Sequence, residues 1–209
     1  MLGLMRKDLC LLLQRSRALA VMVGVGVLIG FSTDGAFMIG YMTMISAILS
    51  IGTISYDEFD NGYPFLLTLP VTRKGYVTAK YLFCLLGVLA GWAAASVIFA
   101  GCCLVRGEGF RMEQLAEALA FLPAAGLMTA VMLPLQLKYG AEKSRLALAV
   151  LAGGVVALGY VGMKLFPGLP GSLPGISGTA FGAALVGACI AALAVSFYCS
   201  LGIMEKKEL

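Results

Sequence analysis

The chain has no histidine, one tryptophan and few charges: Asp, Glu, Lys and Arg together make up 12% of its 209 residues. No GxxxxGK[ST] loop occurs, so we expect no ATP hydrolysis by the chain itself. The long apolar runs lack ionisable residues in their central parts, and their serines have no base beside them. These absences argue against an enzyme of the membrane interior, against a bound metal or cofactor, and against a proton-coupled carrier.

Six cysteines are present, mostly within apolar runs and without CxxC spacing, and no histidine is available to share a metal with them. We interpret them as small buried hydrophobic residues. The formal charge of +4 is small and its basic residues lie in separate gaps between apolar runs, so no nucleic-acid partner is expected.

Apolar residues dominate the chain, at 60% of the sequence with a mean hydropathy of +0.95. A soluble core of this size could not bury so much apolar surface, so lipid must be the solvent for most of it. The sequence therefore predicts an all-α polytopic membrane protein with a single transmembrane domain over residues 1–209. Six transmembrane helices are expected at about 18–33, 35–56, 77–105, 116–137, 146–164 and 179–204.

An amphipathic helix is expected at residues 1–17, lying in the membrane interface before the first span. Its apolar residues recur every three to four positions, and charged residues occupy the other positions. The apolar positions are Leu2, Met5, Leu9 and Leu12, and the polar ones are Arg6, Lys7, Asp8 and Gln14.

Several local features shape the other spans. Pro123 and Pro134 are expected to bend the fourth span. A basic loop is expected at 138–145, and a turn-rich loop or short re-entrant excursion at 166–178. The GxxxG pairs Gly26/Gly30 and Gly87/Gly91 would allow close approach of neighbouring helices.

The distribution of basic residues predicts the orientation of the chain. Twelve of the 15 Lys and Arg residues fall on the side that holds both termini and the loops after the second and fourth spans. The positive-inside rule then places both termini in the cytoplasm.

Residues 57–76, here named the coupling segment, form a polar break on that same side. Phe59, Tyr63, Leu66 and Leu67 could form one apolar face of a short cytoplasmic helix that ends at Pro70. Thr72 is a suitable N-cap for the third span. The segment is either an ordinary interfacial loop or a helix on which a cytoplasmic motor could push.

The pattern of residues 56–81, with LTLPVTRKGYVTAKY at its end, resembles the permease subunits of ABC-2 type transporters, in particular small bacterial permeases encoded apart from their ATPase. The resemblance implies a multi-pass protein of the bacterial cell membrane and a separate ATP-binding cassette ATPase that binds ATP and Mg. It also implies a second permease copy or a sister permease, and export of an amphipathic peptide, lipid-like or drug-like substrate. The implied ATPase contacts are Asp57, Glu58, Phe59, Tyr63, Pro64, Phe65, Leu66, Leu67 and Leu69.

A translocation path would need mildly polar residues within the spans. The candidates are Thr43, Ser46, Ser50, Thr53, Thr129 and Gln136, each of which could instead bond its own helix backbone. The alternative function is a non-transporting membrane immunity or scaffold protein, which would not need the coupling segment.

Overall fold

The computed structural model describes residues 2–14, 16–32, 35–58, 72–107, 118–165 and 178–206. The described elements are all helical, which confirms the predicted all-α fold. They are α1 (Leu2–Gln14), α2 (Ser16–Ser32), α3 (Gly35–Ile51), α4 (Thr53–Glu58), α6 (Arg73–Arg106), α8 (Phe121–Leu165) and α9 (Gly178–Lys206).

Four helical stretches of the described chain are long and apolar enough to cross a membrane: Gly35–Asp57, Arg73–Arg106, Phe121–Gly140 and Gly182–Lys206. They correspond to the second, third, fourth and sixth predicted spans. The first predicted span corresponds to α2, which meets this criterion only together with α1, from which it is bent by 67°. The fifth predicted span corresponds to the second half of α8. The chain is therefore a polytopic membrane protein, and the number of six spans stays a prediction.

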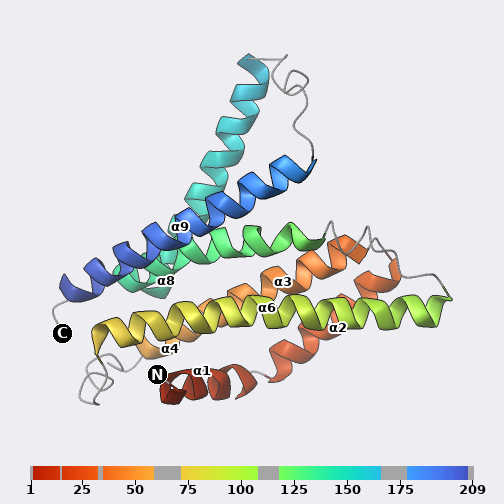
Figure 1. Cartoon of the computed structure of the whole chain (residues 1–209), viewed down its shortest axis with the longest axis horizontal. Coiled ribbons are helices and arrows are strands. Elements are labelled where there is room, and N and C mark those ends of the chain that lie inside the picture. The colour runs from red at the N-terminus through yellow and green to blue at the C-terminus, as the bar shows by residue number, and fades with distance from the viewer. Residues whose placement is uncertain are drawn as a thin grey trace.

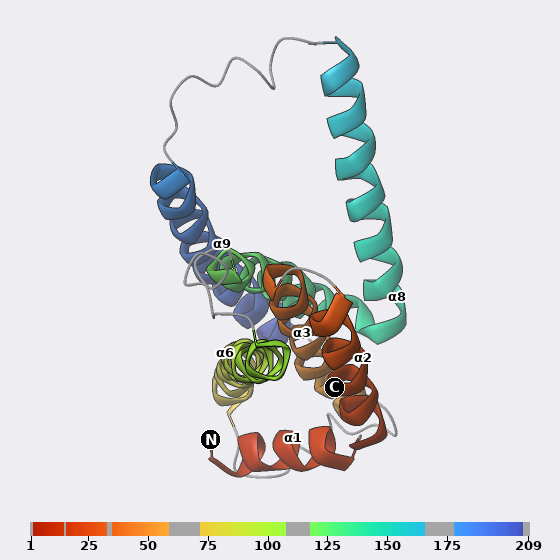
Figure 2. The same cartoon turned by 90° about the vertical axis from the view of Figure 1, so that its right-hand side faces the viewer.

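Helix α8 has two limbs, before and after a break at Gly140. Helices α3, α6 and the first limb of α8 run side by side, with α9 packed against α8 and α6 (Figure 1). Figure 2 looks along α6 and shows α1 extending across one side of the bundle, and Figure 1 shows α1 extending partly along α6 as well, so α1 is oblique to the bundle. The described ends of α1 and α9 lie near the start of α6 (Figure 1). The described ends of the two terminal helices thus lie at one end of α6, and the interfacial position of α1 stays a prediction.

The predicted close approach at glycines is confirmed, and α3 is the partner in both cases. A Cβ atom added to Gly87 or Gly91 of α6 would collide with Ser50 or Ser46 of α3. A Cβ atom on Gly26 of α2 would lie 2.9 Å from the sulfur of Met42. Glycine thus lets α3 sit closely between α2 and α6.

The expected loop at 138–145 is wrong, because helix continues on both sides of a single break. Gly140 has φ 81° and ψ 173°, a backbone conformation that glycine adopts without a Cβ penalty. Figures 1 and 2 show α8 turning there, so that its second limb leaves the bundle. Pro134 lies inside the first limb, but the non-helical residue is Gly140.

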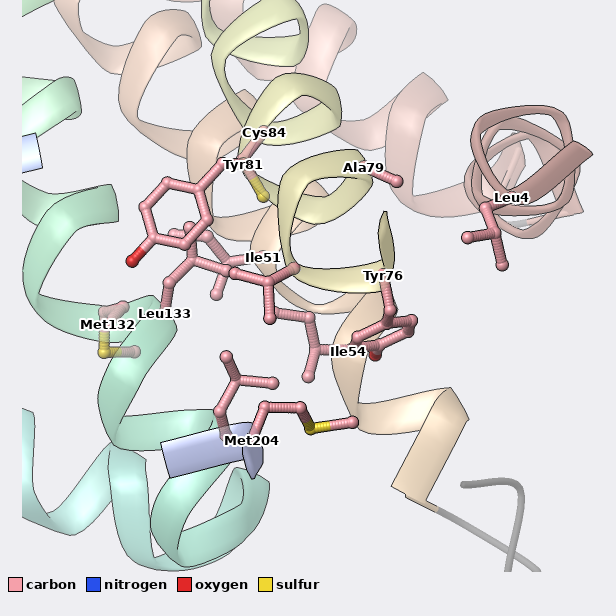
Figure 3. Packing of buried hydrophobic residues seen from close by; sticks show 12 residues of the cluster. Leu4, Ile51, Ile54, Tyr76, Ala79, Tyr81, Cys84, Met132, Leu133 and Met204 are labelled. Carbon is pink, nitrogen blue, oxygen red and sulfur yellow. The ribbon is translucent and has the colours of Figure 1, made fainter. Parts of the chain in front are cut away.

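The main core lies where α1, α3, α4, α6, α8 and α9 converge, near the start of α6 (Figure 3). Tyr76, Ile54 and Leu133 are among its buried side chains, and Leu4 reaches it from α1. Thr72 caps α6, as predicted, because its side-chain oxygen accepts a hydrogen bond from the backbone N–H of Gly75 at 3.1 Å. The start of α6 is therefore fixed both locally and by packing.

Candidate functional site

Helix α1 turns a charged residue towards the protein, contrary to the sequence expectation. Asp8 is completely buried, and Leu4, one turn earlier, is buried on the same face. Leu9 and Leu13 are about half exposed. The sequence analysis placed Asp8 among the polar positions of an amphipathic helix, but the structure buries it, because the protein supplies a buried partner for its carboxylate.

That partner is Lys80, in the third turn of α6. Its ammonium nitrogen Nζ lies 2.7 Å from both carboxylate oxygens of Asp8 and 2.7 Å from Oδ2 of Asp57 at the end of α4. Thr53 Oγ1 is 3.5 Å away, and the ring centre of Tyr76 is 5.5 Å away. Lys80 is 1% exposed, so nearly all of its interactions are made inside the protein.

Asp57 is held by more than this lysine. The Tyr76 hydroxyl donates a hydrogen bond of 2.8 Å to Asp57 Oδ2, and the ammonium of Lys7 pairs with Oδ1. Asp57 is 3% exposed, whereas the Lys7 side chain is one-third exposed. Lys7, Asp8, Asp57 and Lys80 are named the ion cluster below.

The ion cluster is electrically balanced, with two cations and two anions. Taking an ion out of water costs several kcal/mol, and only close pairing with further hydrogen bonds offsets that cost. A 34-residue helix is about 50 Å long, which exceeds the roughly 30 Å hydrocarbon core. If α6 overshoots equally at both ends, Lys80, about 10 Å from its start, lies at the edge of the hydrocarbon. Pairing within the balanced cluster thus offsets the cost of placing four charges at the edge of the hydrocarbon.

The first turn of α6 is also bonded to the end of α9. Arg73 Nη1 donates hydrogen bonds to the carbonyl oxygens of Met204, at 3.2 Å, and Glu205, at 2.8 Å. A cation is favourable at a helix C-terminus, where carbonyl groups lack helical partners. The start of α6 is therefore connected by polar contacts to α1, α4 and α9.

These contacts lie on both sides of the central part of the coupling segment. Asp57 precedes residues 59–71, and Arg73, Tyr76 and Lys80 follow them. The predicted coupling helix and the predicted contacts Phe59, Tyr63, Pro64, Phe65, Leu66, Leu67 and Leu69 lie outside the described residues. Glu58 is the last residue of α4. The buried Asp57 carboxylate makes its contacts within this chain, and an ATPase contact at this residue stays a prediction.

The predicted path residues are buried or partly buried, and four of their hydroxyls bond main-chain carbonyls. Thr43, Thr53 and Thr129 each donate to their own helix or the preceding turn, at 2.7 to 2.8 Å. Ser46 donates to Thr43, and also to the carbonyl oxygen of Gly87 on α6 at 3.1 Å. Ser46 therefore joins α3 to α6, whereas the three threonines bond locally.

Ser50 and Gln136 complete the predicted set. Ser50 is 1% exposed and faces Gly87 across the α3–α6 contact. Gln136 is 4% exposed, and its Oε1 has no hydrogen-bond partner among the described residues. A translocation path through these positions stays a prediction.

The ion cluster was missed by the sequence analysis, although a weak signal for it exists. Asp8 is the one acidic residue of the N-terminal helix, and Lys80 is the one charge in the predicted third span, on the same expected side. Opposite charges in apolar surroundings at one membrane face favour pairing. The pair spans 72 positions, however, and sequence alone does not say which helices meet.

A family model described as ABC-2 family transporter protein matches residues 3–205, which is nearly the whole chain. No curated protein matches the chain at a significant level. The family match covers the described helices except for the first residue of α1 and the last residue of α9, and so includes both the ion cluster and the coupling segment.

Proposed function

The chain belongs to the ABC-2 family of transporter proteins, and on that premise we propose that it couples ATP hydrolysis by a separate ATP-binding cassette subunit to export of an amphipathic substrate. The substrate would be a peptide, a lipid-like compound or a drug-like compound. The permease would work as a pair, with a second copy or a sister permease, in the bacterial cell membrane with both termini in the cytoplasm. The ATPase subunit would bind ATP and Mg.

The position of the ion cluster is the observation that supports this proposal most. A force applied to residues 59–71 would reach α4 through Asp57 and α6 through Arg73. Because Lys80 and Asp57 are both paired with α1, the three helices would move together and not separately. Charged pairs that are buried and short resist separation more than exposed ones do. The coupling segment would thus transmit force to α1, α4 and α6 as one rigid unit.

Co-purification tests the ATPase partnership. The operon is expressed with a tag on the permease, and we expect the ATPase to be retained with it. Leu66→Asp would place a carboxylate on the predicted apolar face and should lower ATPase recovery at least tenfold. Lys143→Asp is the matched control, because it adds an acid at an exposed position outside the coupling segment. Absence of an ATPase from the purified wild-type complex would overturn the proposal.

A second experiment separates binding of the ATPase from transmission of its motion. In Lys80→Met/Asp8→Asn the direct bond between α1 and α6 is removed, while Lys7 and Asp57 remain a balanced pair. We expect the ATPase to be recovered as in wild type, whereas the ratio of its rate in the complex to its rate alone falls towards one. An unchanged ratio would show that the cluster takes no part in coupling.

The alternative, a membrane immunity or scaffold protein, predicts a different dependence on the coupling segment. Deletion of residues 59–69 should abolish export if the chain is driven by an ATPase. A scaffold that sequesters a toxic peptide would protect cells equally well after the deletion, provided that membrane insertion is unchanged.

A further inference from the structure

A large apolar pocket lies between α1, α2, α3 and α6, and none of the four residues of the ion cluster is part of its lining. Its volume is about 790 Å³, within the range of about 300–1,000 Å³ that is usual for ligand sites. All four helices contribute to its lining, which is almost entirely hydrocarbon. Among the described residues that line it, Arg6 is the one charged side chain.

The two faces of α1 explain why the pocket exists. Leu4 and Asp8 turn towards the core and the ion cluster, which attaches α1 to α4 and α6. Met5, Leu9 and Leu12, spaced by four and three residues, line the pocket from a different face of the same helix. Helix α1 is thus held by one face, and the other covers an open apolar space.

The opposite wall is formed by α3 and α6, and it offers few polar groups. Ser46 lines the pocket, but its hydroxyl already donates to two main-chain carbonyl oxygens. Gly87 and Gly91 also line the pocket, where α6 packs closely against Ser50 and Ser46 of α3. Leu86, also in the lining, is 46% exposed, so the pocket opens at its side to the surroundings of the helices.

Those surroundings are lipid wherever a span faces outward. Water would gain few hydrogen bonds in a space with this lining, whereas a hydrocarbon chain replaces apolar contacts that an empty space would lack. Arg6 adds a cation, and a guanidinium can bind two phosphate oxygens in parallel. We propose that this pocket binds an anionic phospholipid of the bilayer, with one acyl chain among Met5, Leu9 and Phe83 and the phosphate on Arg6.

This site is independent of the proposed ATPase coupling, since it needs only a bilayer. Native mass spectrometry of the full-length purified chain, with added dioleoyl-phosphatidylglycerol or dioleoyl-phosphatidylcholine, measures its occupancy. We expect the anionic lipid to bind about fivefold more tightly, the amount that one basic residue near a membrane surface contributes.

Two variants and two matched controls test the site. Arg6→Gln should reduce binding of phosphatidylglycerol to the level of phosphatidylcholine, whereas Arg17→Gln, an exposed arginine outside the lining, should leave the preference intact. Gly3→Leu should lower the binding of both lipids at least fivefold, because Gly3 lines the pocket and has room for a side chain. Gly101→Leu adds the same side chain at an open position outside the lining and should bind as wild type does.

Three results would overturn the proposal. Equal binding of the two lipids by the wild-type chain would remove the role of Arg6. An equal loss in Arg6→Gln and Arg17→Gln would indicate attraction by surface charge without a site. Unchanged binding in Gly3→Leu, with a circular dichroism spectrum like that of wild type, would place the lipid elsewhere.

Discussion

Removal of the buried ammonium in Lys80→Met should be among the most damaging single changes in this chain. Methionine keeps much of the length of the lysine side chain, so the variant removes the charge but changes the side-chain volume little. Asp8 and Asp57 would then share only Lys7, and the cluster would carry one net negative charge. Breaking a buried pair in this way typically costs about 3–5 kcal/mol, because a charge is left buried without compensation.

The expected cost translates into a measurable change in thermal stability. For a chain of this size, about 1 kcal/mol shifts Tm by about 2–4 °C, so Lys80→Met should unfold roughly 6–20 °C below wild type in detergent. Lys74→Met is the matched control, since Lys74 pairs with Glu205 at 3.8 Å and both side chains are more than half exposed. An exposed pair of this kind contributes about 0–1 kcal/mol.

Rescue by a second substitution distinguishes charge imbalance from general damage. Asp8→Asn added to Lys80→Met restores neutrality, because Lys7 and Asp57 then balance each other. We expect the double variant to be more stable than Lys80→Met alone, so that the two effects are not additive. Equal Tm values for Lys80→Met and Lys74→Met, or additive losses in the double variant, would refute the reasoning.

Three further predictions concern contacts of α6. Gly91→Val should lower the free energy of unfolding by about 1–3 kcal/mol, because the new side chain meets Ser46 on α3. Gly101→Val, whose side chain enters open space, should not; equal Tm values for the two variants would contradict the close α3–α6 contact. Tyr81→Phe removes the hydroxyl that joins α6 to two serines of α9, and we expect a loss of about 1–3 kcal/mol in the same thermal assay. Arg73→Gln should lower Tm by only a few degrees, because its two hydrogen bonds lie at the partly exposed end of α9. It should also make the C-terminus more sensitive to protease, and unaltered sensitivity would argue against Arg73 holding the end of α9.

The sequence by itself determined the lipid surroundings, the all-α class and the family of this protein. Long uncharged runs locate the helices, because the backbone N–H and C=O groups of a segment in lipid must form their hydrogen bonds within that same segment. The Thr72 cap and the glycine pairs were also readable, since each depends on a few neighbouring residues or on a short repeat. The family resemblance carried by residues 56–81 agrees with the family match over residues 3–205.

Only the tertiary structure decided which helices meet and which face of α1 is turned inward. The local pattern of α1 groups Asp8 with the polar positions because its side chain is charged. In the structure Lys80, 72 positions away, pairs with this carboxylate and offsets the cost of burying it. Gly140 likewise looked like part of a loop, because a single left-handed residue between two helices has no distinctive pattern in sequence. Such pairings and turns depend on the position of distant segments in space, and that information is absent from any local stretch of the chain.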